Sequence, residues 1–150
     1  MPGPSANPAP ETLERFLVAQ AADYEVALAE LRRGRKQTHW IWYVLPQLRG
    51  LGLSAMSQRY GIADLQEART YAEHPVLGAR LRECVAAIAA HPGLSAERIL
   101  GGIDAMKFRS CLTLFLRAAP QEPLFSQALQ QFFGGEQDER TVALLAADAP

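Results

Sequence analysis

Apolar residues recur along most of the chain at the three- and four-residue spacing that is typical of amphipathic α-helices. The clearest case is residues 13–31, where the apolar positions form one stripe along a long helix. Gly34 follows this segment, and Arg32 and Arg33 stand where cations complement the helix dipole. The pattern therefore predicts a first helix that ends at Gly34.

Proline, glycine and N-capping residues divide the rest of the chain into shorter apolar segments. Residues 39–45 have the aromatic and β-branched content of a strand, but no partner strand is evident, so we expect a buried helix that Pro46 ends. The expected helices after the first one cover residues 36–45, 54–60, 64–72, 76–90, 95–100, 104–118, 123–133 and 138–146. The pattern predicts an all-α fold, one compact domain of about eight to nine short helices in an irregular, orthogonal bundle.

Length and composition agree with a single domain. The chain has 150 residues, of which 49% are apolar, which is enough to bury about two-thirds of the unfolded chain's surface. We expect the domain to cover residues 12–147. Residues 1–11 are rich in proline and alanine and lack the charged start and apolar core of a secretory signal, so they predict a flexible leader.

The cysteines and the hydropathy bear on location. No apolar run approaches the roughly 20 residues of a membrane-spanning helix, so no membrane contact is expected. Cys84 and Cys111 lie in apolar helical patterns, which is typical of buried thiols in a reducing cytoplasm, although one disulfide between them stays open. We therefore predict a cytoplasmic protein.

Charge is unevenly distributed although the net charge is only −1. Residues 31–63 contain six of the 15 cations and no aspartate or glutamate, while the remainder has nine cations against 16 acids. Both tryptophans lie in this acid-free window. The negative remainder would repel a long polyanion, so nucleic-acid binding is not expected, and any function is best sought in the window itself.

Several motifs resemble those of a known family. The window contains GRKQTHWIWYVLPQLRGLG from Gly34 to Gly52, and Asp104-x-x-Lys107-x-x-Ser110-x-x-Thr113 follows later. In these motifs, over about residues 12–145, the chain resembles DUF1810, a bacterial family of uncharacterised proteins. The resemblance implies a mainly helical single domain and supplies no established activity. Some members carry the name calpastatin, but calpastatin-type inhibitors are long, disordered, charge-rich chains, unlike the apolar pattern here.

The acid-free window holds candidate ligand-binding residues. Arg35 and Lys36, with nearby backbone amides, could bind an anion. Trp40 or Trp42 could stack on a base, and Gln47 could read the edge of a base or an amide. In the alternative interpretation, the cations only complement a helix end and the tryptophans belong to the core. Because Trp40 and Trp42 are two residues apart, they cannot share one face of a helix, so at least one of them is expected in the core.

His39 is the best acid–base candidate because histidine titrates near neutrality. His74 and His91 each precede a proline at a helix end, where a structural role is expected. Arg49 lies in a glycine-containing loop that a ligand could approach. The histidine and cysteine spacings do not make a zinc site, and no motif indicates a cofactor, so neither is expected. A nucleophilic pairing of His39 with Cys111 would require an activated thiol, which a buried cysteine does not supply.

A second group of polar residues lies on the predicted helix of residues 104–118. Asp104, Lys107, Ser110 and Thr113 follow at three-residue intervals and form one polar stripe, with Arg109 beside it. Such a stripe is costly on an apolar helix unless it is hydrogen-bonded or faces a cavity. One interpretation is a surface ion pair of little value. The other is that the stripe faces the segment from His39 to Gln47 across a cleft.

These patterns lead to two functional hypotheses. The first is a binding domain for an anionic, base-containing small molecule such as a nucleotide. Its enzymatic version is a hydrolase of the N-glycosidase or ADP-ribose-processing type, in which His39, Asp104 and Lys107 would be catalytic. The second is a protein-interaction module that docks an acidic partner on the basic, aromatic window. A concave pocket with converging His39 and Lys107 would favour the first, and a flat, exposed tryptophan the second.

Overall fold

The first helix ends where the sequence predicts. In the computed structural model, which describes residues 12–148, helix α1 spans Glu14–Arg33. Gly34 adopts the left-handed conformation with φ +79°, and its N–H donates to the carbonyl of Leu31. Because a left-handed residue turns the chain away from the helix axis, glycine is favoured at this position.

Eight further helices follow among the described residues, and they confirm the all-α prediction. They are α2 (Ile41–Val44), α3 (Ala55–Tyr60), α4 (Leu65–Glu73), α5 (Leu77–Ala89), α6 (Ala96–Leu100), α7 (Gly102–Ala118), α8 (Pro123–Phe133) and α9 (Glu139–Asp148). Ser54, Asp64 and Ser95 cap α3, α4 and α6 as expected. Within residues 12–148, strand-like pairing is limited to one isolated parallel bridge between Leu48 and Ile62.

The segment of residues 36–45 differs most from its prediction. The expected ten-residue helix is reduced to the four residues of α2, and residues 36–40 form an irregular loop. The backbone N–H groups of Gln37 and Thr38 bond the carboxylate of Glu30 in α1, so they do not take helical partners. Helix α7 also begins at Gly102, two residues before the predicted start at Asp104.

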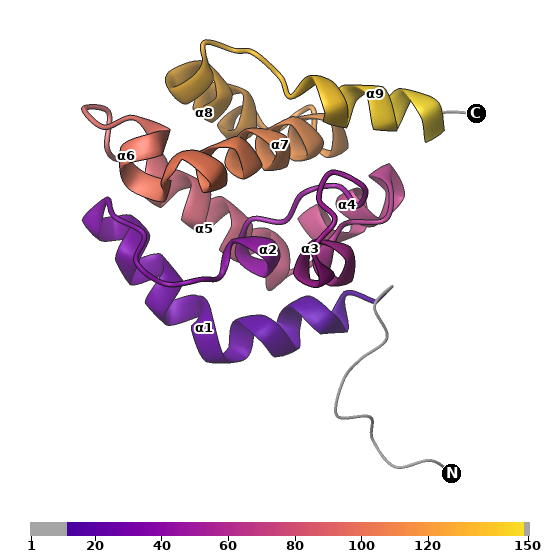
Figure 1. Ribbon diagram of the computed structural model, residues 1–150, viewed down its shortest axis with the longest axis horizontal. Helices are drawn as coiled ribbons and strands as arrows, with labels where there is room; N and C mark the ends of the chain where they lie inside the picture. Colours follow the sequence, from indigo (N-terminus) through magenta and orange to yellow (C-terminus); the bar gives the residue numbers. More distant parts are fainter. Residues whose placement is uncertain (1–11, 149–150) are drawn as a thin grey trace.

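Helix α7 lies at the centre of the single compact domain, with α4, α6, α8 and α9 packed around it (Figure 1). Its buried residues include Phe108, Cys111 and Phe115, and Phe115 meets the rings of Tyr71 and Phe125. The loop and short helices of residues 34–61 lie between α1 and α7 in Figure 1. This arrangement brings the acid-free window next to the polar residues of α7.

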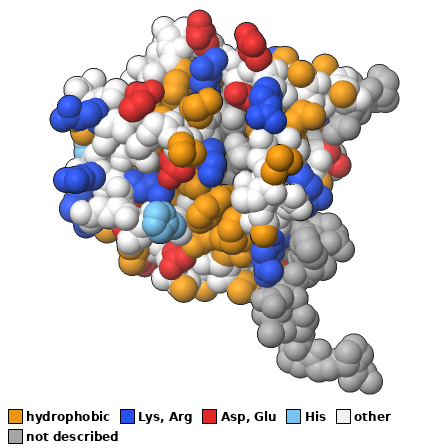
Figure 2. Space-filling view, in the orientation of Figure 1, with side chains coloured by type: hydrophobic (Ala, Val, Ile, Leu, Met, Phe, Trp, Pro, Cys, Tyr) orange, Lys and Arg blue, Asp and Glu red, His pale blue; other side chains and the backbone are white. Residues whose placement is uncertain are grey.

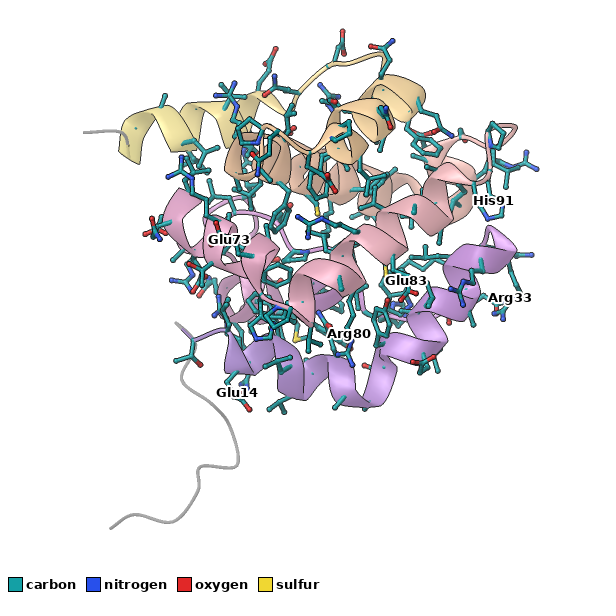
Figure 3. The ribbon with its side chains drawn as sticks, turned by 180° about the vertical axis from the view of Figure 1, so that it is seen from behind. Glu14, Arg33, Glu73, Arg80, Glu83 and His91 are labelled. Atoms are coloured by element: carbon teal, nitrogen blue, oxygen red, sulfur yellow. The ribbon has the colours of Figure 1, made fainter. Side chains whose placement is uncertain are left out.

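The side of the molecule seen in Figure 3 is closed by α1 and α5. Arg80 on α5 points toward α1, where its guanidinium lies 4.7 Å from the centroid of the Tyr24 ring. The Tyr24 hydroxyl donates a hydrogen bond to Glu83, which lies one turn after Arg80 on α5. At the end of α1, the His91 ring nitrogen lies 2.9 Å from the carbonyl oxygen of Leu31. This face is therefore held together by contacts between its own side chains.

Burial makes both cysteine thiols unreactive. Cys84 and Cys111 are buried, unpaired thiols. Burial raises the pKa of Cys84 to about 12, and burial raises the pKa of Cys111 as well. Neither thiol is therefore ionised near neutral pH. Separately, the helices within residues 12–148 include none with the length and apolar character needed to cross a membrane.

Candidate functional site

The first half of the acid-free window is organised around Glu30. This carboxylate is only 2% exposed and accepts four hydrogen bonds from the loop. The donors are the backbone N–H groups of Gln37 and Thr38, the Thr38 hydroxyl at 2.6 Å and the Trp40 indole N–H at 3.0 Å. Burial alone would raise the pKa of Glu30, but these hydrogen bonds lower it to about 2. Glu30 is thus ionised and fixes the loop.

Lys36 joins this loop to α7. Its ammonium lies 2.9 Å from Asp104 and donates to the Thr38 carbonyl at 2.6 Å. It also lies 5.0 Å from the centroid of the Trp40 ring, and Trp40 is 1% exposed. The sequence predicts ligand binding for Lys36 and Trp40, but the structure gives both of them internal partners.

The second half of the window faces α7 across a cavity. The Lys107 ammonium lies 5.2 Å from the centroid of the Trp42 ring and 4.0 Å from Asp104. The cavity is narrow, with enclosed room for about one water molecule. It is lined by Trp42, Gln47 and Lys107, with Met56 and Tyr60 of α3 beside them. We call it the Trp42–Lys107 cleft. The polar stripe of α7 therefore meets the window at Asp104 and at Lys107 rather than along its whole length.

A second, more open hollow lies beside the cleft. The two share Gln47 and Lys107 as lining residues, so they lie side by side, and we call them together the depression. The outer hollow is also lined by Leu51, Gly52, Ile103, Met106, Ser110, Asp138 and Arg140. Figure 2 shows hydrophobic side chains next to lysine and arginine side chains in the middle of this face.

Trp42 has a polar group without a partner. Its indole N–H is buried and finds no hydrogen-bond acceptor among residues 12–148. A buried donor left unpaired costs about 1–3 kcal/mol, so natural proteins rarely leave one without a ligand or solvent partner. Lys107 covers one side of the ring, and the unpaired N–H is the polar group that Trp42 offers to a ligand.

His39 does not converge with Lys107. It is exposed, and its imidazole makes no hydrogen bond to any residue of the described part. It lines a separate hollow with Lys36 and Asp104, and this hollow meets the outer one at Ile103. Of the three residues considered as catalytic, only Lys107 lines the Trp42–Lys107 cleft itself.

Two arginines of the window lie elsewhere. Arg35 lines a different hollow at the end of α1, together with Arg33, Arg98 and Glu97. Arg49 has a buried Nε and Nη2 without an acceptor in the described chain, but it does not line the cleft. Cations of the same acid-free window therefore lie at different places on the molecule.

The rest of the α7 stripe is divided between the hollow and the packing of α9. Ser110 lines the outer hollow and donates to the Met106 carbonyl within its own helix. Thr113 is fully buried and accepts from the Asp138 backbone N–H. Arg109 donates to the carbonyls of Glu136 and Gln137 at 3.0 and 3.1 Å. Thr113 and Arg109 therefore hold the segment before α9 rather than the cleft.

Several residues that line the depression were not among the candidates. Met56 and Tyr60 lie four residues apart on α3, so their shared face could have been inferred from helical spacing. Ile103 and Met106 lie three residues apart on α7, so the same spacing places them on one face, whereas only the packing of α9 against α7 brings Arg140 to them. Within residues 12–148, no group of three or more histidine, cysteine or acidic side chains could hold a metal ion.

Comparison with known proteins agrees with this architecture. The family model described as "Protein of unknown function (DUF1810)" matches residues 10–145. The chain is therefore a helical single-domain protein that belongs to the DUF1810 family. It is similar to the conserved hypothetical protein Rv1873 from Mycobacterium tuberculosis, with 48% identity and a TM-score of 0.89. That match covers 92% of this chain and 99% of the mycobacterial one. No match is found among the curated proteins.

Proposed function

We propose that the protein binds a small anionic ligand, of the nucleotide type, with an anionic oxygen of the ligand in the Trp42–Lys107 cleft. One observation carries the proposal: the buried indole N–H of Trp42 lacks an acceptor, and the Lys107 ammonium lies over the same ring. An anionic oxygen in the cleft could accept from both groups. It would satisfy the unpaired N–H and gain a charge-assisted hydrogen bond from Lys107.

The other polar groups of the cleft support an anion with a polar extension. The Gln47 amide can both donate and accept, so it could recognise an amide or the edge of a base. Met56 and Tyr60 supply an apolar wall. Asp104 is the nearest acid, and Lys36 already neutralises it at 2.9 Å. The local charge around Lys107 therefore favours a negatively charged ligand.

Isothermal titration with inorganic phosphate, succinate, AMP and ADP-ribose tests this proposal. We expect saturable binding of at least one of them. Replacing Lys107→Met should weaken it by about tenfold or more, the size expected for one charge-assisted hydrogen bond. Trp42→Phe keeps an aromatic ring but removes the N–H and should weaken binding by a smaller factor.

The matched control is Arg35→Gln, which also removes one cation of the window but lines a different hollow. We expect its affinity to equal that of the wild type. Absence of binding by every probe, or equal losses in Lys107→Met and Arg35→Gln, would refute the assignment of the ligand to this cleft.

A hydrolase of the N-glycosidase or ADP-ribose-processing type is the second candidate. It is favoured by the Asp104 carboxylate, 4.0 Å from Lys107, because such reactions use a carboxylate to stabilise an oxocarbenium-like centre. Asp104 is, however, held by Lys36, and His39 lines another hollow, so we expect binding without turnover. Chromatography of NAD and ADP-ribose after incubation tests this. Product formation that Asp104→Asn abolishes would establish the hydrolase instead.

A further inference from the structure

The depression around Lys107 is bordered by large apolar side chains that no part of the described chain covers. Ile103 and Met106 on α7 are 75% and 70% exposed, and both line the outer hollow. Leu53, which directly follows the lining residue Gly52, is 89% exposed. These three have the highest exposure among the exposed large hydrophobic residues of the described chain. Ile103 and Met106 line the hollow beside the Trp42–Lys107 cleft, which makes this face the strongest candidate for a docking surface.

A ligand that stays within the cleft would leave these side chains in water. Small ligands are held mainly inside a concavity, whereas Ile103 and Met106 lie in the shallow outer part and expose most of their surface. Covering them requires a partner that extends out of the cleft and along the surface of α7.

The depression has the shape that such a partner needs. The hollow lined by His39 meets the outer hollow at Ile103, and the outer hollow meets the cleft at Gln47 and Lys107. Together they follow the first half of α7. From Gly102 to Ser110 this half measures about 12 Å along the helix axis, which matches about four residues of extended polypeptide.

We call this row of three hollows along α7 the groove. The charges that line the groove favour an acidic partner. Its two carboxylates have internal partners, since Asp104 pairs with Lys36 and Asp138 bonds the N–H and hydroxyl of Thr141. The Lys107 ammonium lies no closer than 4.0 Å to Asp104, which is a long contact for an ion pair. Arg140 makes no ion pair within residues 12–148. The groove therefore retains positive charge between apolar side chains.

We propose that this groove binds an extended polypeptide segment of another protein, with an aspartate or glutamate flanked by apolar residues. A carboxylate oxygen of the acidic side chain reaches into the Trp42–Lys107 cleft, and the flanking residues cover Ile103 and Met106. This inference rests on the proposed anion site and names the kind of molecule that carries the anion. A polypeptide fits better than a membrane surface because the positive charge lies in a depression rather than on a protruding face.

Fluorescence anisotropy with short, acetylated and dye-labelled peptides tests the inference. The peptides carry a central aspartate between leucines, and the matched control has asparagine in its place. We expect the aspartate peptide to bind at least tenfold more tightly than both the asparagine peptide and free succinate. The double variant Ile103→Ser, Met106→Ser should lose about tenfold in peptide affinity, while its succinate affinity stays unchanged. Both residues are exposed, so the variant should keep the wild-type circular dichroism and melting temperature.

The control is Val18→Ser, Val26→Ser, which removes two other exposed apolar residues, on α1. It should bind peptide like the wild type. If succinate or AMP binds but the aspartate peptide binds no better, the inference fails while the anion site stands. If no probe binds, both fail.

Two further outcomes would show that the groove binds something other than a polypeptide segment of another protein, and either one would overturn the inference. One is binding to phosphatidylglycerol vesicles, lost in the double variant, without peptide binding. The other is a concentration-dependent dimer in sedimentation experiments that the same double variant abolishes.

Discussion

Trp40 and Trp42 lie two residues apart, and each has one of the chain's two lysines over its ring, yet their polar groups have different fates. Trp40 is in the core, and its N–H donates to Glu30 at 3.0 Å. Trp42 lines a cavity, and its buried N–H has no acceptor among the described residues. The Trp40 cluster is complete in itself. The Trp42 cluster contains donors that only a ligand or solvent can satisfy, which is why it carries the functional proposal.

Removing the acceptor of the Trp40 cluster should have the largest effect on stability. In Glu30→Gln, an amide NH2 replaces one oxygen, so at least one of the four loop donors loses its acceptor. We expect a loss of about 3 kcal/mol in the free energy of unfolding, measured by urea denaturation at neutral pH. The control is Glu97→Gln, an exposed acid at the edge of another hollow, which should change stability little.

The pH dependence of the Glu30→Gln variant shows whether its loss of stability comes from the charge of Glu30 or from packing. The pKa of Glu30 is about 2 in the folded chain against 4.5 for an ordinary glutamate. The unfolded chain therefore takes up this proton at a higher pH than the folded chain does. The stabilisation is complete above about pH 5 and is lost as the pH falls from 4.5 toward 2. In Glu30→Gln this part of the acid destabilisation should be missing, and an unchanged slope would contradict the role given to Glu30.

The two tryptophans should respond unequally to the same substitution. Trp40→Phe leaves a space in the core and deprives Glu30 of one donor, so we expect a loss of about 2 kcal/mol. Trp42→Phe removes a buried N–H that has no acceptor, so its cost should stay below about 1 kcal/mol. Thermal or urea unfolding of both variants measures the difference. Equal losses would mean that the Trp42 N–H is satisfied in the free protein and would remove the main support for the ligand site.

The two lysines should show the same contrast with smaller effects. Lys36→Met removes the 2.9 Å contact with Asp104 and the bond to the Thr38 carbonyl, for an expected loss of about 1 kcal/mol. Lys107→Met removes only a 4.0 Å contact with Asp104 and should cost less than about 0.5 kcal/mol. Urea denaturation in low salt measures both. A larger loss in Lys107→Met would assign Lys107 a structural role instead of the ligand-binding role proposed for it.

Local signals in the sequence were sufficient where neighbouring residues decide the structure. Gly34 ends α1, Ser54 caps α3 through the Ser57 N–H, and Pro123 begins α8, each as expected from short-range rules. The expected helix of residues 36–45 was wrong because a residue outside it decides its shape. Glu30 lies in a different helix, and its sequence context gives no sign that its carboxylate turns inward to hold the loop.

The candidate site shows the same limit. The acid-free window and the α7 stripe are both apparent in the sequence, and a cleft between the stripe and the segment from His39 to Gln47 is one of its two interpretations. The contact of Lys107 with Trp42 is known only from the structure. The sequence could not separate the residues that reach the cleft from those that do not. Arg35 and Lys36 are adjacent in the chain, yet one lines a hollow at the end of α1 and the other pairs with Asp104.

The sequence by itself determined the helical class, most helix ends and the acid-free window, because helix periodicity, capping and charge are properties of neighbouring residues. Only the tertiary structure decided which tryptophan belongs to the core, which lysine is internally paired and where the apolar side chains of α7 remain exposed. Those outcomes depend on whether a partner from a distant segment arrives within hydrogen-bonding or van der Waals distance. Glu30 arrives at Trp40, and within residues 12–148 no equivalent acceptor arrives at Trp42.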